Sequence, residues 1–278
     1  MVVIKNPKRW YIKLFTLGEN FSLRNFSDNS KKFVLNALGL FIVVTFTFYV
    51  ESVGDEFEKR EEYLDVVKGI QEEINDVLSF TDNYIDDTNL YSEILLELYR
   101  KWELNNDSIF VDYLDDGYLF IPLNMVFEGR SYNPFKPKNL KYTLFQKGQL
   151  DFALINQNLS IKIIEIYEGN KLKKLYQYTA EYDPDIVRRY RKIMYQKWSN
   201  ELPYVDVEDE EFWINNRRYI QNDRELKSLV FERLSLWEYT LKKNLIEYKT
   251  SVEQGKQMLD SLISAMENEK YFLYWKID

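Results

Sequence analysis

The chain contains no cysteine and no histidine among its 278 residues. Without thiols it cannot form a disulfide, and it offers no cysteine nucleophile or zinc–thiolate site. Without imidazole it lacks Ser-His-Asp and Cys-His arrangements, a histidine general base and the usual ligands of catalytic zinc or iron. Any catalysis would have to use carboxylates, lysine, tyrosine or a hard metal. We therefore expect no enzymatic activity, no metal and no cofactor.

Glycine and proline are also scarce, with 9 and 6 residues. This scarcity disfavours loop-rich barrels, and neither a G-x-x-x-x-G-K-[ST] nor a G-x-G-x-x-G motif occurs. Aromatic residues, in contrast, are abundant, with 22 Tyr and 18 Phe. The net charge of −8 argues against nucleic acid as the main partner. These features are typical of a mainly α-helical protein.

One long apolar run lies near the N-terminus, from Phe33 to Val50, and the pair Lys31-Lys32 precedes it. It carries no charge and comes close to the roughly 20 residues needed to cross a bilayer. The lysines can extend to the lipid surface at one end, and Tyr49 suits the interface at the other. We predict a transmembrane signal anchor at 33–50. The alternatives are a buried helix and a cleaved signal peptide, which normally lies nearer the N-terminus and ends in small residues.

Charge predicts the orientation of this span. Residues 1–32 hold seven basic and two acidic residues, which gives them a net charge of +5. Because the whole chain has a net charge of −8, residues 33–278 have a net charge of −13. The positive-inside rule then places 1–32 in the cytoplasm and 51–278 outside it. In a bacterium this corresponds to the inner membrane, with the bulk of the chain in the periplasm.

The segment 7–15 alternates basic residues with aromatic and aliphatic ones, including Trp10. It is either an interfacial helix that rests on acidic lipid or a disordered tail. Membrane lipid is thus the first expected partner. The residues predicted to anchor the chain are Trp10, Lys31, Lys32, Phe33, Tyr49 and Val50.

Beyond the span, residues 55–86 carry a narrow stripe with a spacing of 4,3,4,3,4,3, typical of a helix with a heptad seam. We predict that this helix is buried in an antiparallel bundle; a parallel coiled-coil homodimer is the alternative. A second helical run is expected at 89–103, with Leu90, Ile94, Leu98 and Trp102 on one face. The seam consists of Tyr63, Val67, Ile70, Ile74, Val77, Thr81 and Tyr84.

The middle of the chain is rich in strand-forming and aromatic residues. Residues 109–123 include Asp116-Gly117, a hairpin turn signal, so a small β-hairpin is expected there, with an irregular aromatic segment as the alternative. The C-terminal tail, 271–278, is also aromatic. Since aromatic residues are enriched in protein interfaces, the candidate partner-binding residues are Phe110, Tyr113, Tyr118, Phe120, Tyr271 and Trp275.

Further helices are expected at 140–147 and 149–167, where Phe152, Ile155, Leu159, Ile163 and Ile166 form a stripe, and at 172–179 after the interruption at Gly169-Asn170. Asp183-Pro184-Asp185 has the pattern of a helix start, which predicts a helix at 183–199. The acidic run 206–211 is expected to be a connection. A long final helix at 223–267 should pair antiparallel with the first exterior helix.

Three kinds of charged cluster are candidate sites. The carboxylates of Asp82, Asp86 and Asp87 lack the spacing of a calcium loop, so a solvated helix end is favoured. The neighbouring pairs Glu72-Glu73 and Asp115-Asp116 do not converge as a general acid and base would. A basic cluster resembles an anion-binding surface, but pairing with nearby acids is favoured. It comprises Arg188, Arg189, Arg191, Lys192, Lys197, Arg217 and Arg218.

The order of these segments resembles a Bacteroidetes family of single-pass membrane proteins of unknown function. The closest local likeness is the stretch YTLFQKGQLDFALINQNLS at 142–160, a helix, a glycine and an apolar helix that contains Asn. The likeness extends over most of the chain, but the exit of the span lacks the Asn-Asn-Trp-like ending of that family. The resemblance implies a membrane location and high helical content, and it assigns no catalytic residue.

The sequence as a whole predicts a mainly α protein: a cytoplasmic segment (1–32), a transmembrane helix (33–50) and an elongated extracytoplasmic helical domain (51–278). The leading functional hypothesis is a non-enzymatic accessory or scaffold subunit that binds membrane or periplasmic proteins. The alternative is a sensory module that binds a small ligand between helices and signals through a separate transducer.

Overall fold

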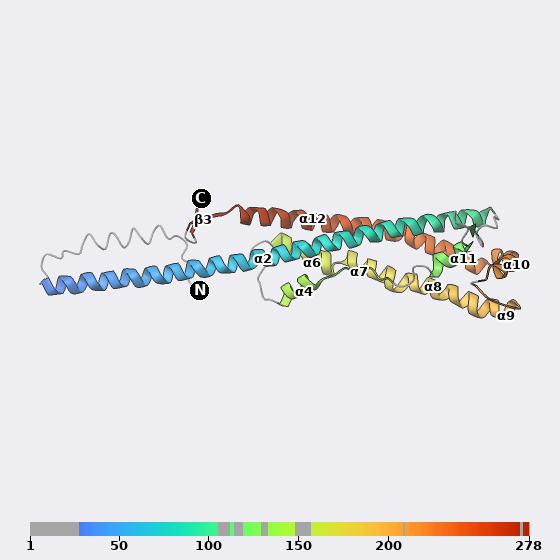
Figure 1. Cartoon of the computed structure of the whole chain (residues 1–278), viewed down its shortest axis with the longest axis horizontal. Helices are drawn as coiled ribbons and strands as arrows, with labels where there is room; N and C mark the ends of the chain where they lie inside the picture. The colour runs from blue at the N-terminus through green and yellow to red at the C-terminus, as the bar shows by residue number, and fades with distance from the viewer. Residues whose placement is uncertain are drawn as a thin grey trace. The chain divides into compact units, whose positions relative to one another are not determined.

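The computed structural model describes residues 28–104, 112–113, 119–128, 133–147, 157–207, 209–272 and 275–277. The described chain is mainly helical (Figure 1). It divides into two compact units, Met1–Glu61 with Lys270–Asp278, and Glu62–Glu269. The second unit contains the buried hydrophobic core.

The longest element, α2, runs from Asp28 to Glu103 without interruption. It contains the predicted span, the predicted seam helix and the run expected at 89–103, so the expected break near residue 88 is wrong. No proline or glycine lies between positions 70 and 103. Thr88 donates its hydroxyl hydrogen to the carbonyl oxygen of Tyr84 at 2.7 Å, within the same helix. The threonine thus bonds back to the helix instead of capping a new one.

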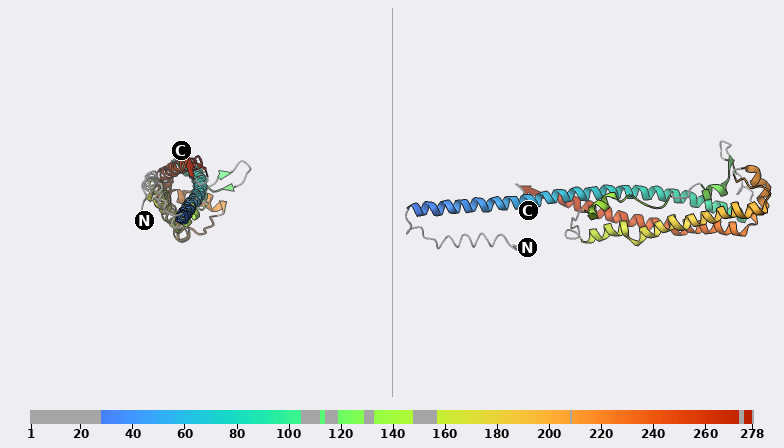
Figure 2. Two further views of the ribbon diagram at one scale, coloured as in Figure 1. Left: turned by 90° about the vertical axis from the view of Figure 1, so that its left-hand side faces the viewer. Right: turned by 90° about the horizontal axis from the view of Figure 1, so that it is seen from below.

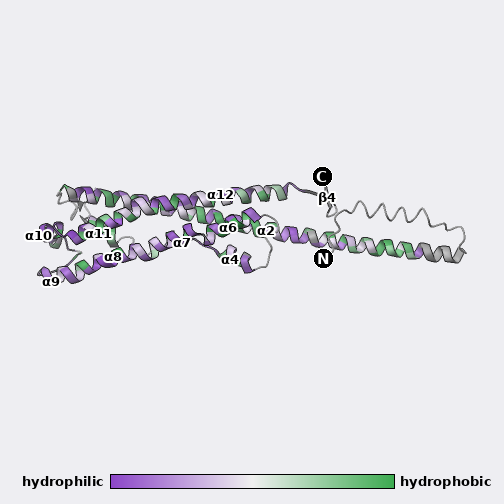
Figure 3. Ribbon diagram, turned by 180° about the vertical axis from the view of Figure 1, so that it is seen from behind, coloured by the Kyte–Doolittle hydropathy of each residue, from purple (hydrophilic) through white to green (hydrophobic). Residues whose placement is uncertain are grey.

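The apolar run makes α2 the one helix in the described part of the chain that is long and apolar enough to cross a membrane (Figure 3). Its most apolar window has a mean hydropathy of 1.7 and is not buried within the chain, unlike the core helix of a soluble protein. Thr47 donates to the carbonyl oxygen of Val43 at 2.8 Å, so this hydroxyl is satisfied inside the helix.

The predicted anchoring residues fall largely on this helix. Lys31, Lys32 and Phe33 belong to α2, and Tyr49 and Val50 are exposed on it. Trp10 lies outside the described residues, as does most of the segment 1–32.

The seam of α2 is buried in the second unit. All seven residues from Tyr63 to Tyr84 that were expected there are less than 9% exposed, so the prediction of an intramolecular bundle is confirmed. Because the chain's own helices cover this face, it does not form the seam of a parallel coiled-coil homodimer. The buried stripe continues differently from the prediction: Leu90 is exposed, and Ile94 is only partly buried. The buried positions beyond Tyr84 are Thr88, Ser92, Leu95, Leu98 and Trp102.

The final helix pairs antiparallel with α2, as predicted (Figures 1 and 2). It consists of α11 (Arg224–Leu234), the π-helix η5 (Ser235–Leu241) and α12 (Lys242–Glu267) without a break. Lys68 pairs with Glu267 at 2.6 Å, Gln71 donates to Asp260 at 2.5 Å and Asp82 pairs with Lys249 at 2.7 Å. Partner numbers fall along α12 as they rise along α2, which defines the antiparallel register.

A third continuous helical run contains α7 (Asn170–Gln177), η3 (Tyr178–Tyr182), α8 (Asp183–Lys192), η4 (Ile193–Trp198) and α9 (Ser199–Glu201). The predicted helix at 183–199 is present as α8, η4 and the start of α9, but Asp183 does not cap a new helix, because Tyr182 and Asp183 already have right-handed helical dihedrals. Pro184 has no N–H to donate to the preceding turn. The wider π turn η3 ends at Tyr182, two positions before the proline, and the helix continues across Pro184.

The shorter helices are α3 (Pro122–Glu128), α4 (Leu140–Lys147), α6 (Gln157–Glu168) and α10 (Glu210–Gln221). The bounds of α4 match the prediction. In α6, Leu159, Ile163 and Ile166 are buried as expected, whereas Phe152 and Ile155 lie outside the described residues. A side chain at Gly169 would place its Cβ 2.1 Å from the carbonyl oxygen of Glu165, so the bend between α6 and α7 requires glycine.

A carboxylate from α2 fixes the start of α4. Glu73 is buried and accepts hydrogen bonds from the backbone N–H groups of Lys141 at 2.6 Å and Tyr142 at 3.1 Å. Free N–H groups at a helix start normally need such an acceptor. Glu73 was considered only as half of a carboxylate pair, and the structure gives it a capping role.

Two short strand pairs complete the description. Strand β1 (Asp112–Tyr113) pairs antiparallel with β2 (Leu119–Phe120), and β3 (Lys270–Phe272) with β4 (Trp275–Ile277). The first pair amounts to two residues per strand within the range 109–123. Most of the segment lies outside the described residues, so the expected hairpin stays a prediction.

Candidate functional site

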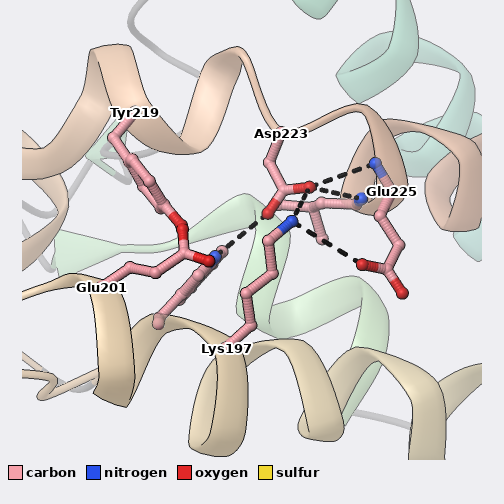
Figure 4. Close-up of polar contacts among 7 residues, drawn as sticks. Lys197, Glu201, Tyr219, Asp223 and Glu225 are labelled. Carbon is pink, nitrogen blue, oxygen red and sulfur yellow. Dashed lines mark hydrogen bonds and ion pairs between the residues drawn. The ribbon is translucent and has the colours of Figure 1, made fainter.

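A hollow of about 660 Å³ opens at the end of the second unit where α9, α10 and α11 meet (Figure 4). It lies where the chain turns from the third helical run into the final helix, and charged and amide side chains dominate its wall. The lining residues are Lys197, Glu201, Arg218, Tyr219, Asn222, Asp223, Arg224 and Glu225.

Asp223 organises the floor of this hollow. One oxygen, Oδ1, accepts the backbone N–H groups of Glu225 at 3.1 Å and Leu226 at 3.3 Å, and thereby caps α11. The other, Oδ2, accepts the indole N–H of Trp198 at 3.2 Å. Lys197 Nζ lies 2.9 Å from Oδ1. A single buried carboxylate thus connects η4 to the start of α11.

The charges of this pair stabilise each other. Burial alone would raise the pKa of Asp223, but hydrogen bonds from Lys197 and Trp198 outweigh it, and the net pKa is lowered. The hydrogen bond to Asp223 in turn raises the pKa of Lys197. Both groups are therefore charged at neutral pH, and each serves as the counter-ion of the other.

The hydroxyl of Tyr219 donates to the carboxylate of Glu201 on the other side of the hollow. Burial, followed by this hydrogen bond, raises the pKa of Tyr219 well above its usual range. The phenol therefore remains a proton donor and holds the Glu201 carboxylate in place. Figure 4 shows the two polar groups side by side.

The two arginines of the hollow differ from these residues. Arg218 and Arg224 are exposed, and neither side chain forms an ion pair with another described residue. Two guanidinium groups at one rim can bind carboxylate or phosphate oxygens in a bidentate manner. The arrangement therefore suits recognition of an acidic group from outside the chain.

Within the rest of the basic cluster, the favoured interpretation of internal pairing is confirmed for Arg188 and Arg189. Arg188 pairs with Asp185, and Arg189 pairs with Asp185 at 3.1 Å and Glu232 at 2.5 Å. Lys197 forms an ion pair with Asp223, as described above. The cluster expected along one helix is thus mostly neutralised, and the cations without an internal ion pair at the hollow come from α10 and α11.

A second polar cluster lies wholly inside the unit. Asp183 accepts from Arg233 through both oxygens, at 2.8 Å from Nε and 2.9 Å from Nη2, and from the indole N–H of Trp237 at 2.7 Å. Arg233 is 1% exposed and Asp183 4%. The guanidinium carbon also lies 5.4 Å from the ring centroid of Phe127 and 5.3 Å from that of Trp237.

The π-helices border both clusters. Asp183 follows η3 directly, Trp237 lies in η5, and Lys197 and Trp198 lie in η4. A π turn contains an extra residue, so it rotates the side chains that follow relative to an α-helix. Each of the three π turns therefore contains or precedes a polar side chain that points into the interior.

Among the described residues, no group of three or more Asp or Glu side chains is arranged to hold a metal ion. In the acidic group considered as a cation site, Asp82 pairs with Lys249. Four of the predicted partner-binding residues lie on the short strands. Tyr113 and Phe120 lie in β1 and β2, Tyr271 and Trp275 lie in β3 and β4, and Phe110 and Tyr118 lie outside the described residues.

Sequence reasoning noted Arg217-Arg218 but missed Arg224, Tyr219 and the hollow itself. The acidic run at 206–211 was interpreted as a connection, although Asp209 caps α10 by accepting the N–H of Glu211 at 3.0 Å. An Asp followed by two Glu ahead of an aromatic residue is a recognisable helix start, and it would have placed α10 and its arginines beside Asp223.

The chain matches no protein-family model, no curated protein and no solved structure. The resemblance to the Bacteroidetes family therefore stays a prediction, and functional arguments rest on the geometry above.

Proposed function

We propose that this chain is a membrane-anchored, non-enzymatic accessory or scaffold protein that binds a protein partner at the hollow formed by α9, α10 and α11. The observation that carries the proposal is the pair Arg218 and Arg224, which form no ion pair with another described residue, whereas Lys197, Asp223 and Glu225 beside them pair with one another. Tyr195, Tyr204 and Ile214, from the same part of the chain, are exposed as well. Arginine and tyrosine are the residues most enriched at binding hot spots.

In this proposal the anchor is the apolar part of α2, with residues 1–32 in the cytoplasm and the second unit on the opposite side. The support is the exposed apolar surface of α2 and the charge difference between the segments before and after it. In a bacterium, protease added to spheroplasts should digest the second unit, because it would lie outside the inner membrane. Protection of that unit would contradict the orientation.

The binding experiment compares three forms of the full chain, purified from gently solubilised membranes with quantitative detection of co-purifying proteins. The first is the natural sequence, and the second carries Arg218→Glu and Arg224→Glu. The third carries Lys174→Glu and Lys243→Glu, the same charge change at exposed lysines away from the hollow.

We expect a stoichiometric partner with the natural chain and with the lysine variant, and its loss with the arginine variant. Replacement of a hot-spot residue weakens binding by about 2 kcal/mol or more, and the proposal assigns that role to these two arginines. A monomeric natural chain without any stoichiometric partner, or equal recovery of the partner with all three forms, would refute the proposal.

A further inference from the structure

One side of α12 carries no charge along the C-terminal half of the helix. Every fully exposed residue from Thr250 to Ala265 is uncharged, although 29% of the residues in the whole chain are charged. Since the centres of protein interfaces are depleted of charged residues and enriched in methionine, this side has the composition of a contact surface. We call it the neutral face, and it consists of Thr250, Gln254, Gln257, Met258, Ser261, Leu262 and Ala265.

The charged residues of the same half of α12 lie on the side that faces α2. Lys249, Asp260 and Glu267 are the residues that contact α2 in the antiparallel pair described above. Glu253 lies 3.9 Å from Lys249, and Lys256 follows Lys249 by seven positions, which places it on the same side. The contact with α2 therefore takes the charges of this segment, and the neutral face is left on the outside.

A groove of about 680 Å³ runs over the neutral face where α12 passes α6. Met258 and Leu262, both half-buried, contribute apolar surface to it. Lys162 from α6 is the charged residue among the described residues of the lining, and it donates to Glu165 at 3.1 Å and to Ser251 Oγ at 2.8 Å. The groove thus offers apolar surface, and the lysine at its edge already has a counter-ion.

The polar groups of the neutral face are suited to contact with identical groups. Ser261 donates to the carbonyl oxygen of Gln257 at 2.8 Å, and Thr250 donates to that of Ile246 at 2.9 Å, so both hydroxyl hydrogens are satisfied within the helix. The amides of Gln254 and Gln257 contain donors and an acceptor, so each can pair with the same amide of a second copy. A lysine or a glutamate at these positions could not pair with itself.

We propose that the neutral face is the contact between two copies of this chain, in which two parallel α12 helices pack about a two-fold axis. Gln254, Met258, Ser261 and Ala265 recur with a spacing of 4,3,4, the repeat of one side of a parallel helix pair, so each residue meets its own counterpart. The small side chains of Ser261 and Ala265 allow the two helices to approach closely. The parallel arrangement rests on the proposed membrane anchor, because copies anchored in one membrane point the same way.

Charge favours a second copy over other occupants of this face. Residues 33–278 have a net charge of −13, so two copies repel each other where their charged surfaces meet, and this repulsion is smallest at a face without charge. A basic partner would be attracted to acidic surface instead, and an acidic one to the arginines of the hollow. The anchor also confines the copies to one plane, which raises their effective concentration, so that a contact of modest strength is sufficient.

The absence of cysteine makes a direct test possible, because a single introduced thiol can form a disulfide within this protein only with a second copy. The full chain with Ser261→Cys is oxidised with copper phenanthroline in its membrane, and the linked dimer is quantified on a non-reducing gel. A disulfide needs Cα atoms within about 7 Å of each other. The matched control is Ser228→Cys, at an exposed serine of α11 outside the neutral face, and it should give at least fivefold less dimer than Ser261→Cys.

A second substitution in the Ser261→Cys chain tests the face itself. Ala265→Glu brings two carboxylates together at the axis and should lower the yield of dimer at least fivefold, whereas Ser228→Glu should not change it. Arg218→Glu with Arg224→Glu should also leave the yield unchanged, because the hollow and the groove share no lining residue. Circular dichroism checks that each variant is folded.

Equal yields of dimer from Ser261→Cys and Ser228→Cys would overturn the proposal, and so would an unchanged yield with Ala265→Glu. Loss of the dimer in the arginine variant would move the contact to the hollow and overturn it as well. The co-purification experiment with the arginine variant is separate, so failure of the dimer and failure of partner binding are distinguished.

Discussion

The ion pair between Asp183 and Arg233 offers the sharpest test of how the second unit is held together. Replacement of Asp183 by Asn keeps the shape of the side chain and removes its charge. Arg233, 1% exposed, would then keep a buried positive charge without a counter-ion. Such a charge is costly, because the low polarity of the interior cannot replace the water that the guanidinium lost on folding.

The expected magnitude follows from this geometry. Removal of one partner of a buried pair typically costs about 3–5 kcal/mol. For a unit of about 200 residues, each kcal/mol lowers the melting temperature by roughly 2–4 °C, so Asp183→Asn should lower it by about 6–20 °C. The measurement is thermal and urea unfolding of the full chain in micelles, followed by tryptophan fluorescence and far-ultraviolet circular dichroism.

Asp185→Asn, two positions along the same helix, is the matched control. Asp185 pairs with Arg188 and Arg189 at the surface, where such pairs contribute about 0.2–1 kcal/mol. The double variant Asp183→Asn with Arg233→Met should be less destabilised than the sum of the two single variants, since it leaves neither charge alone. If Asp183→Asn and Asp185→Asn had equal, small effects, the inference that the buried pair stabilises the unit would be wrong.

Three further predictions follow from single positions. Gly69→Ala should stabilise the full chain by about 0.5–1 kcal/mol in urea unfolding, because the new methyl group would lie 3.7 Å from the nearest atom of Lys141, an ordinary contact, and alanine favours the helix; a loss of stability would contradict this. Gly255→Val should instead destabilise it by about 1–3 kcal/mol, because a Cβ there would lie 2.5 Å from Ile166 Cδ1; unchanged stability would show that α6 can shift freely from α12. Asp223→Asn should reduce the loss of stability on acidification. The folded pKa of Asp223 is lowered, so its contribution is present above the ordinary value of about 3.9 and is lost as the pH falls through the folded pKa. Urea unfolding at several pH values would show the difference, and parallel pH profiles for the two forms would refute the role of this carboxylate.

Local patterns predicted those parts of the fold that local physics determines. The seam of α2 was predictable because a heptad spacing over Tyr63–Tyr84 directs one face of a helix inward whatever covers it. The start of the final helix was predictable because Asp223 has the cap pattern and lacks a stronger local competitor. The bounds of α4 followed from the proline-rich segment before it and Gly148 after it.

The failures occurred where a distant residue changes the role of a local motif. Asp183-Pro184-Asp185 has a good local start signal. In the structure, however, the Asp183 carboxylate is buried and accepts a hydrogen bond from Arg233, 50 positions away, and the π-helix η3 continues directly into the helix that contains Pro184. The candidate site was missed for the same reason. Arg218 and Arg224 line the hollow together with Lys197 and Glu201 from η4 and α9, and no spacing in the sequence specifies that approach.

The distribution of buried charge supports a binding role in this chain. The Glu73 carboxylate accepts backbone N–H groups at the start of α4, and Asp183 accepts hydrogen bonds from Arg233 and Trp237. Asp223 pairs with Lys197 and caps the start of α11. Each of these carboxylates accepts hydrogen bonds from donors within the chain. Arg218 and Arg224 at the open hollow, in contrast, form no ion pair with another described residue. Two arginines without an internal counter-ion at an open hollow, in a unit whose buried carboxylates are matched, are what recognition of an acidic partner requires.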